Sequence, residues 1–425
     1  MFKKILSFFI TAVLLVGGLR ILEQRFFADN SDFKIENGIL LSYTGREESV
    51  IIPASVYYIG DNAFSDNEKI VSVELNENVR YIGDNAFYNA TSLVSVTKTD
   101  SIVSIGHNTF AKTPFLQNQE ELFIINHILV KYKGTNEEVY IPDHINSVAA
   151  GAFQGNENIK RVIIHDNVTE IGKSSFEGCL NLQSIDIPKS VLTIGEDAFK
   201  NTLWLNRQND FVVCGNHILV LYKGNSDVPV LPNGLLQIAP GAFENSKIKK
   251  IVLPSTVYII GKKAFQNCIQ LSSVTLSKNL VFIDSCAFNG CASIKHISVL
   301  NKAEKISQNA FANCVQLQQI SLPSSLKSIA DNAFDACPYV KIFTKFNSIP
   351  WEWSEKNNIE TYHQKGDINC DDKINIKDAT YIQKCLAKII HMTDAMKLLG
   401  DVDFDGQVTI KDVTLLQKHL ANFEV

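Results

Sequence analysis

The stretch LQQISLPSSLKSIADNAFDAC, residues 317–337, holds the unit from which most of this chain is built. It contains IADNAF, a version of the six-residue pattern I-G-x-x-A-F that recurs along the 425 residues. The copies end at Phe64, Phe87, Phe110, Phe153, Phe176, Phe199, Phe243, Phe265, Phe288, Phe311 and Phe334. The gaps between these phenylalanines are 23, 23, 43, 23, 23, 44, 22, 23, 23 and 23 residues. Eleven copies at one dominant period identify a repeat protein.

Each unit also carries an apolar triplet at fixed spacing, L-x-x-I-x-L, such as Leu317, Ile320 and Leu322. This spacing places three side chains on the inner side of a short strand, whereas the residues between them point outward. A proline or polar residue then turns the chain, and the phenylalanine returns on the opposite wall. Because one 23-residue unit cannot bury its apolar face alone, the units are expected to stack into a solenoid with a parallel β-sheet.

The two long gaps contain related insertions. NHILVKYKG at residues 126–134 superposes on NHILVLYKG at 216–224, and the same offset from the first copy reaches NGILLSYTG at 37–45. The chain therefore contains three super-repeats of about 90 residues, each opening with a strand–turn–strand insertion. Two interpretations of the insertion stay open. It is either a hairpin that projects from the solenoid edge or an alternative coil that continues the stack.

The unit at residues 317–337 resembles the BspA-like leucine-rich repeats of secreted bacterial proteins, and the resemblance covers roughly residues 35 to 350. It implies a leucine-rich-repeat solenoid, with a parallel β-sheet and short helical or turn returns, in a protein that acts as an adhesin or binding module. The pattern glycine is irregular here. Ala149, Ala239, Asp284, Ser307 and Ala330 replace it, so a positive φ is not required at that position.

The N-terminus is typical of an export signal. Lys3 and Lys4 precede an apolar run at residues 5–16, which is followed by Gly17 and Gly18. This run is shorter than the about 20 residues that a membrane-spanning helix needs. We therefore predict a secreted protein with residues 1–28 as its signal peptide and no membrane span in the mature chain. An uncleaved N-terminal anchor is the alternative.

Nine cysteines in an exported protein would usually suggest disulfides. Four of them, Cys268, Cys291, Cys314 and Cys337, lie 23 residues apart, and Cys179 has the same phase. A cysteine that recurs once per repeat is instead expected to be a small, buried, apolar residue.

The outward strand positions carry mixed charges and many hydroxyl groups, for example at Ser72, Glu74, His296 and Ser298. They contain no aromatic row, which a sugar-binding platform would use. They also contain no basic stripe with aromatics, and the net charge is −5, so nucleic acid is not expected as a partner. This face either binds a protein or glycan ligand through polar contacts or is simply solvated. The chain has no recognisable catalytic motif, and whether it is an enzyme stays open, with the balance against.

Two acidic loops stand near the end of the chain: GDINCDDKINIKD (loop one, residues 366–378) and GDVDFDGQVTIKD (loop two, 400–412). Calcium takes six to eight oxygen ligands, which a twelve-residue loop supplies at positions 1, 3, 5, 7, 9 and 12. The predicted ligands are Asp367, Asn369, Asp371, Lys373 (carbonyl), Asn375 and Asp378 in loop one, and Asp401, Asp403, Asp405, Gln407 (carbonyl), Thr409 and Asp412 in loop two. Loop two has more carboxylates and a glycine, Gly406, at its sharp turn, so it is expected to bind calcium more tightly.

A helix is predicted after each loop and none before. Two loop–helix copies 34 residues apart resemble a type I dockerin over residues 366–425. The resemblance implies two bound Ca²⁺ ions and, as partner, a cohesin domain of a cellulosome scaffold. It assigns cohesin contacts to Ile376, Lys377, Gln383, Lys384 and Lys388 in copy one, and to Ile410, Lys411, Gln417, Lys418 and Asn422 in copy two. Near-equivalent copies make binding in two orientations conceivable, whereas ordinary solvated helix surfaces are the alternative.

The predicted organisation is a signal peptide or anchor (1–28), a solenoid (29–355), a linker (356–365) and a dockerin (366–425). Since the linker is short and has no Pro/Thr-rich tract, the dockerin is expected to lie close to the last coil, whose core Trp351 and Trp353 are expected to cap. The leading hypothesis is a secreted interaction protein attached to a cellulosome or a cell surface. A polysaccharide-degrading cellulosome component, argued only by association with dockerins, and a surface adhesin or protease regulator are the alternatives.

Overall fold

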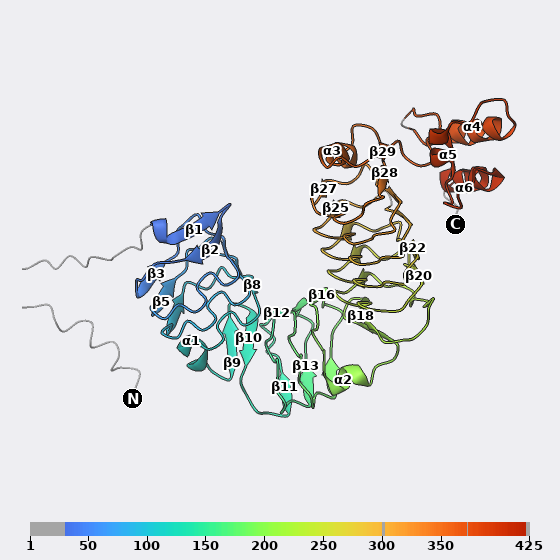
Figure 1. Cartoon of the computed structure of the whole chain (residues 1–425). Helices are drawn as coiled ribbons and strands as arrows, with labels where there is room; N and C mark the ends of the chain where they lie inside the picture. Colours follow the sequence, from blue (N-terminus) through green and yellow to red (C-terminus); the bar gives the residue numbers. More distant parts are fainter. Residues whose placement is uncertain (1–29, 300–301, 372, 422–425) are drawn as a thin grey trace, which may run out of the picture.

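The computed structural model describes residues 30–299, 302–371 and 373–421. The predicted export signal at 1–28 and the predicted partner residue Asn422 lie outside them. Figure 1 shows a strongly bent solenoid followed by a small helical module near the C-terminal end. Neighbouring coils pair in parallel with the period of the sequence, as in the register Val73↔Val96 or Ile297↔Ile320. The predicted leucine-rich-repeat architecture is confirmed.

The strands form two faces. The face that we call the hairpin face contains three sheets, each opened by an antiparallel hairpin and continued by two-residue strands. These sheets are β1(Phe33–Glu36)–β2(Ile39–Tyr43)–β4(Tyr58–Ile59)–β6(Tyr81–Ile82)–β8(Ser104–Ile105); β9(Leu122–Ile125)–β10(Ile128–Tyr132)–β12(Ser147–Val148)–β14(Glu170–Ile171)–β16(Thr193–Ile194); and β17(Phe211–Cys214)–β18(Ile218–Tyr222)–β19(Gln237–Ile238)–β21(Ile259–Ile260)–β23(Phe282–Ile283)–β25(Lys305–Ile306)–β27(Ser328–Ile329).

The opposite face, which we call the ladder face, consists mainly of three-residue strands that carry the L-x-x-I-x-L pattern. Its sheets are β3(Ser49–Ile51)–β5(Ser72–Glu74)–β7(Ser95–Thr97); β11(Glu138–Tyr140)–β13(Arg161–Ile163)–β15(Ser184–Asp186); β20(Lys250–Val252)–β22(Ser273–Thr275); and β24(His296–Ser298)–β26(Gln319–Ser321)–β28(Lys341–Phe343)–β29(Thr361–Tyr362). The triplet side chains point inward as predicted, since Leu317, Ile320 and Leu322 are at most 1% exposed.

The pattern phenylalanines stack in columns through the core. The ring of Phe288 lies 5.0 Å from that of Phe265 and 5.3 Å from that of Phe311, and the planes differ by 5° and 4°. Each column begins on a tyrosine of an insertion, such as Tyr222 against Phe243 at 5.2 Å. The core is therefore divided into three clusters, one for each super-repeat predicted from the sequence.

Both interpretations of the insertions are partly right. Each insertion is an antiparallel hairpin, but its second strand does not project, because it pairs in parallel with the next coil, as β10 does with β12. Short helices precede the second and third hairpins: α1(Pro114–Gln117) and α2(Leu203–Asn206). The ammonium group of Lys223 donates to the carbonyls of Leu205 and Asn206 at 3.0 and 2.9 Å. The lysine of YKG thus satisfies the carbonyls at the end of α2.

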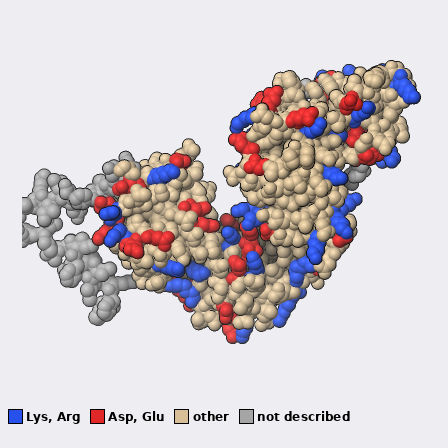
Figure 2. All heavy atoms as spheres, in the orientation of Figure 1, with Lys and Arg blue, Asp and Glu red and all other residues tan. Residues whose placement is uncertain are grey.

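The solenoid bends where these helices are inserted. Figure 1 shows α1 and α2 on the outer side of the bend, whereas β8, β12 and β16 of the hairpin face lie on the inner side. On the inner side, side chains connect coils across each junction: Nε2 of His107 lies 2.6 Å from Oε1 of Gln154, and Lys263 pairs with Glu196 at 2.8 Å. Acidic and basic side chains gather there in Figure 2. The insertions therefore lengthen the outer side of the bend, whereas side-chain contacts join neighbouring coils on the inner side.

The cysteine ladder is buried and reduced. None of the nine cysteines, all of which lie in the described ranges, takes part in a disulfide bond. Each ladder thiol donates to the carbonyl of a pattern phenylalanine in the preceding coil, as Cys291 does to Phe265 at 3.1 Å. The prediction of a small buried residue is confirmed. The pattern glycines avoid positive φ, as their replacement implied, and the left-handed residue lies two positions later, for example at Asn85 with φ 55°.

Beyond the last coil, α3(Ile349–Lys356) covers the end of the core. Trp353 is 8% exposed and its ring lies 5.6 Å from that of Phe334, which confirms its capping role. Trp351 packs instead against Phe346 at 4.9 Å. The remaining elements are the short 3-10 helix η1(Asn30–Asp32) and the helices α4(Ile376–Leu386), α5(Asp394–Gly400) and α6(Ile410–Leu420). Within the described residues, no helix has the length and apolar character needed to cross a membrane.

The phenylalanine columns allow a first prediction. Phe288→Ala should lower the free energy of unfolding of the full chain by about 3–5 kcal/mol, because it opens a cavity between two stacked rings. Urea unfolding followed by circular dichroism measures this loss. Tyr339→Ala is the matched control, since Tyr339 is 66% exposed, and it should change stability by less than about 0.5 kcal/mol. Equal losses in the two variants would contradict the role of the column.

Candidate calcium site and partner face

The C-terminal module is built around two helices that follow the acidic loops. One face of α4 and one face of α6 pack together, and the buried core contains Ile368, Ala379, Ile382, Val413 and Leu416. This core is small for two eleven-residue helices, which are marginal on their own. Further stabilisation must therefore come from the loops or from neighbouring structure.

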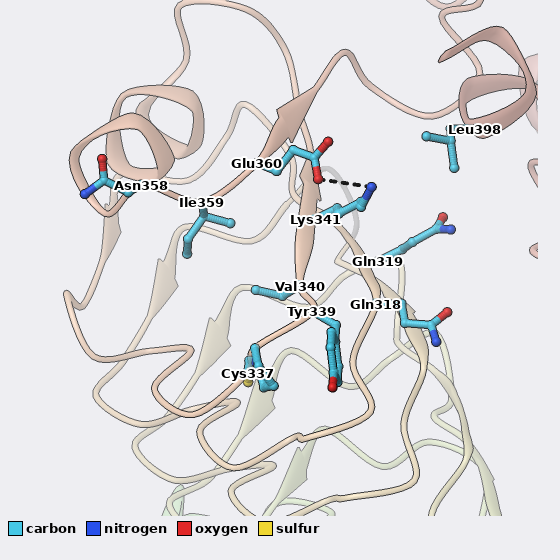
Figure 3. A pocket seen from close by; sticks show the side chains of 11 residues that line it. Gln318, Gln319, Cys337, Tyr339, Val340, Lys341, Asn358, Ile359, Glu360 and Leu398 are labelled. Atoms are coloured by element: carbon cyan, nitrogen blue, oxygen red, sulfur yellow. Dashed lines mark ion pairs between the residues drawn. The ribbon is translucent and has the colours of Figure 1, made fainter. Parts of the chain in front are cut away.

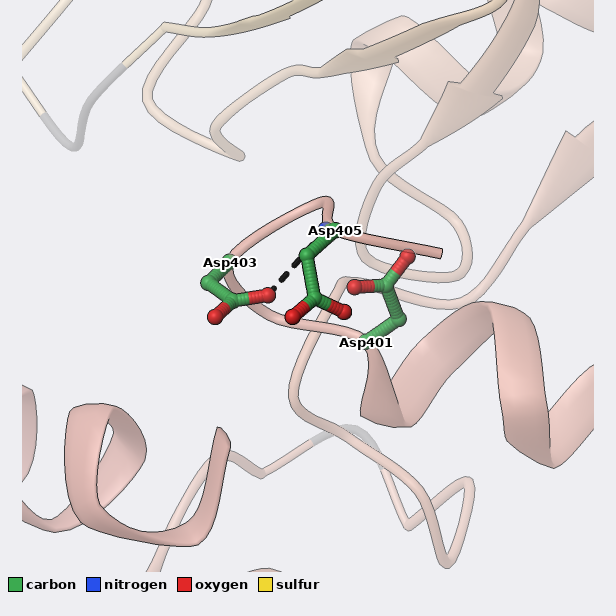
Figure 4. A group of neighbouring side chains, drawn as sticks. All are labelled: Asp401, Asp403 and Asp405. Carbon is green, nitrogen blue, oxygen red and sulfur yellow. Dashed lines mark hydrogen bonds between the residues drawn. The ribbon is translucent and has the colours of Figure 1, made fainter. Parts of the chain in front are cut away.

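Loop two brings three predicted ligands together. Carboxylate oxygens of Asp401, Asp403 and Asp405 all lie within 4.8 Å of one another, and Figure 4 shows the three side chains around one side of the loop. Gly406 follows with φ 87° and open space around it, which gives the sharp turn that the loop requires. Oδ1 of Asp401 is buried and accepts no hydrogen bond from the described part of the chain. A buried oxygen without a donor beside two further carboxylates fits a hard cation such as calcium.

Positions 9 and 12 of the loops also act as helix caps. Thr409 accepts from the backbone of Lys411 at 3.1 Å, and Asp412 accepts from Val402 at 2.7 Å and Thr409 at 2.8 Å. Asn375 and Asp378 form the same capping box at the start of α4. Asp412 and Asp378 are thus held inside their loops by backbone amides. Asp412 does not belong to the carboxylate group that Asp401, Asp403 and Asp405 form.

Loop one has similar turn hydrogen bonds but carries Asn369 where loop two has Asp403. The backbone amide of Asp371 donates to Oδ1 of Asp367 at 3.0 Å and to Oδ1 of Asn369 at 2.9 Å, and that of Lys373 donates to Asp371 at 3.0 Å. In the part of the chain that the structure describes, these side chains form no group comparable to that of loop two. The order of calcium affinity of the two loops stays a prediction.

One structural prediction is wrong. A helix, α5, runs directly into Asp401, so loop two has a helix on both sides. Thr393 caps its first turn by accepting from Met396 at 3.2 Å, and the carbonyl of Leu399 accepts from Gly366 at 2.9 Å. This helix was missed because its seven residues are too few to show a clear period.

A buried lysine from the predicted linker lies beside loop two. Lys365 is 8% exposed, and its ammonium group donates to the carbonyl of Asp401 at 2.6 Å. Burial lowers the pKa of Lys365 to about 8, and the nearby aspartates oppose that change. Burial also raises the pKa of Asp401, against the effect of Lys365. Loss of water therefore outweighs the attraction between the two groups.

Comparison with known families accounts for both parts of the chain. The family described as BspA type leucine-rich repeat region matches in six copies, over residues 35–128, 123–209 and 230–350. The chain belongs to the BspA-type leucine-rich repeat family. The type I dockerin domain matches residues 365–421, so the C-terminal module is a dockerin. Type I dockerins bind calcium, which agrees with the acidic group of loop two. A solenoid joined to a dockerin is the composition of a cellulosome-type interaction protein.

Several solved structures of bacterial proteins are similar to this chain. A leucine-rich cell surface protein from Faecalibacterium prausnitzii is 24% identical, with a TM-score of 0.35, and the match covers 75% of this chain and 94% of that one. The pneumococcal vaccine antigen PcpA is 16% identical, with a TM-score of 0.36 and coverage of 78% and 96%. A repeat protein from Bacteroides ovatus is 22% identical, with a TM-score of 0.30 and coverage of 78% and 97%. No curated protein matches the chain.

The residues assigned to the partner face of the dockerin are accessible. Ile376 is 59% and Ile410 is 61% exposed, unusual values for isoleucine. Lys377, Gln383, Lys384 and Lys388 in copy one, and Lys411, Gln417 and Lys418 in copy two, are exposed as well. Each copy therefore presents an apolar residue beside basic and amide groups.

Two sets of residues were missed by the sequence reasoning. The first is Phe404, at position 4 of loop two, which contacts His296 on the ladder face. Loop one has Cys370 at that position, and this difference between otherwise similar loops could have pointed to a separate role for Phe404. The second set is aromatic and lies on the hairpin face of the first coils, outside the L-x-x-I-x-L strands. Tyr57 and Tyr81 are each 45% exposed, and Tyr58, which packs against Tyr81, has its hydroxyl 3.2 Å from Asp61.

The loop geometry leads to a prediction for calcium binding. In the full chain, Asp405→Asn should weaken the tighter calcium site by at least about tenfold, because ligand charge sets the affinity of such sites. The substitution keeps an oxygen that can accept from Gln407. Asp371→Asn should affect the weaker site only, and Asp394→Asn, which alters an acid outside the loops, should affect neither. Isothermal titration calorimetry measures the calcium affinities of all three variants. If Asp371→Asn alone weakened the tighter site, that site would belong to loop one instead of loop two.

Proposed function

We propose that this protein is an exported interaction protein whose dockerin binds a cohesin in a calcium-dependent way while its solenoid binds a glycan. The observation that carries the cohesin part is the repeated combination of an acidic loop with an exposed isoleucine and lysines at the start of the following helix. Export is supported by the N-terminal pattern, and neither part of the proposal requires catalysis.

Charge supports a docking surface that depends on metal. Residues 366–425 contain ten acidic residues and seven lysines, a charge of −3. Seven of the acids are predicted ligands, so two bound ions would bring the charge to about +1 and leave the lysines to define the surface. Asp401, Asp403 and Asp405 would hold one ion, and Asp367, Asn369 and Asp371 the other. When bound, the ions would neutralise the loops and tie them to the helices.

The tyrosines on the hairpin face support the glycan part. Tyr57 packs over Gly38, where a side chain would clash with its ring. Tyr58 and Tyr81 pack edge to face at 6.2 Å, and Asp61 lies next to them. Exposed rings beside carboxylates offer a sugar both an apolar face and hydrogen-bond acceptors. Because these rings lie on the inner side of the bend, a chain-like ligand could follow the concave surface.

Cohesin binding gives the next prediction. The full-length protein should be retained by an immobilised type I cohesin with calcium and released by a chelator. Substitution of Lys377, Lys384, Lys411 and Lys418 by alanine should lower the affinity by at least about thirtyfold, as expected for the centre of an interface. Lys397→Ala, which changes an exposed lysine on α5, is the control. If the chelator does not release the protein and the variant with four substitutions is retained as the parent is, this part of the proposal is refuted.

The tyrosine cluster is tested separately. A glycan array should identify the ligand of the full chain, and Tyr57→Ala/Tyr81→Ala should reduce its affinity at least about tenfold, because two stacking contacts are lost. Tyr140→Ala and Tyr339→Ala are matched controls, since these residues are 63% and 66% exposed but lie elsewhere. If the double variant binds as the parent does, or if only proteins bind the solenoid, the glycan site is wrong.

A further inference from the structure

The dockerin rests on the ladder face of its own solenoid. Strand β29, within the predicted linker, pairs in parallel with β28 in the register Ile342↔Thr361 and Phe343↔Tyr362. Beyond it, a hollow of about 630 Å³ is lined on one side by β22, β24 and β26 and on the other by residues of the dockerin. A second hollow of about 660 Å³ reaches from Gln318 to Leu398 of α5, and Figure 3 shows Lys341 and Glu360 paired within it.

The contact is centred on two rings and one cation. The ring of Phe404 stacks on that of His296 at 5.2 Å, with 22° between the planes. The ammonium group of Lys365 lies 4.5 Å from the ring of Phe404 and 5.2 Å from that of Phe343. One buried linker residue thus touches the solenoid, loop two and, through the carbonyl of Asp401, the end of α5. Cation–π contacts are stronger when water is excluded, as it is around Lys365.

The two dockerin copies contribute unequally to this contact. Copy two supplies six residues to the first hollow, among them Phe404, Leu415 and His419, whereas copy one supplies only Ile374. The equivalent residues 34 positions earlier are Cys370, Tyr381 and Cys385, and none of them lines either hollow. The near-symmetry of the two copies is therefore broken by the solenoid to which they are attached.

Helix geometry relates this asymmetry to the partner face. In α6, Lys411 and Lys418 are four and three residues away from Leu415, so all three side chains lie on adjoining parts of the helix surface. A partner that contacts both lysines would come close to the ladder face of the solenoid. Lys377 and Lys384 flank Tyr381 in the same way in α4, and Tyr381 lines neither of the two hollows.

We propose that the solenoid holds the dockerin by loop two and so presents copy one, through Ile376, Lys377 and Lys384, as the face that meets a cohesin. This inference rests on the cohesin binding proposed above and adds a single orientation to it. Two equivalent orientations, which the sequence alone suggests, would then be available only when the dockerin is released from the ladder face.

Affinities of paired variants in the full chain test the choice of copy. With calcium, Lys377→Ala/Lys384→Ala should weaken cohesin binding by at least about thirtyfold, whereas Lys411→Ala/Lys418→Ala should weaken it by less than about threefold. His296→Ser changes a residue on the solenoid, outside the calcium loops. When it is added to each paired variant, the two losses of cohesin affinity should become equal, at about twofold each, because either copy can then bind the cohesin. His144→Ser, an exposed histidine on another coil, should leave the asymmetry intact. Equal effects in the parent chain would overturn the proposal.

Hydrogen–deuterium exchange provides a readout that needs no cohesin. Amides of residues 296–298 and 402–405 should exchange faster in His296→Ser and in Phe404→Ser than in the parent, and His144→Ser should not differ from it. Unchanged exchange in both variants would show that the contact is absent in solution and would overturn the proposal. If no form binds a cohesin, the proposed function fails together with the choice of copy. If cohesin binds and the two copies are equivalent, only the present inference fails.

Discussion

Stacking of one apolar unit on the next is the constraint on which the solenoid depends. A single coil has too few inward side chains to exclude water, and each phenylalanine is buried only because another lies about 5 Å above or below it, as Phe288 does between Phe265 and Phe311. The register of the coils, the buried cysteines and the inward triplets all follow from this column. Its ends therefore need covers, and Trp353 at one end closes it with a larger ring.

The insertions turn a straight stack into a curved one. They end one column and begin another on a tyrosine, and the helices α1 and α2 add chain on only one side. The ion pair between Lys263 and Glu196 then fixes the inner side across a junction. Curvature brings the hairpin face of the first coils to the inside and leaves the ladder face of the last coils outside, where the dockerin lies. The two proposed binding surfaces thus lie on opposite sides of the bend.

Much of the fold could be predicted because the repeat shows the same local pattern eleven times. The spacing of Leu317, Ile320 and Leu322 determines which side chains face inward, and the acids of loop two converge as their positions require. What the sequence could not show depends on contacts between distant residues. Phe404 and His296 are 108 positions apart, and nothing in either local pattern indicates that they meet. Asp412 has the sequence position of a ligand, but its oxygens accept from backbone amides, which only the folded loop reveals.

The cysteine ladder has a consequence for how this protein folds. Each ladder sulfur is held by a carbonyl of the preceding coil rather than by a covalent partner, so no cross-link has to be chosen among nine cysteines. The native state can form without oxidants or isomerases that shuffle disulfides, and a reducing medium removes nothing from it. The stability of the native state therefore depends on packing between neighbouring coils, and whole coils can be added or deleted during evolution to change it.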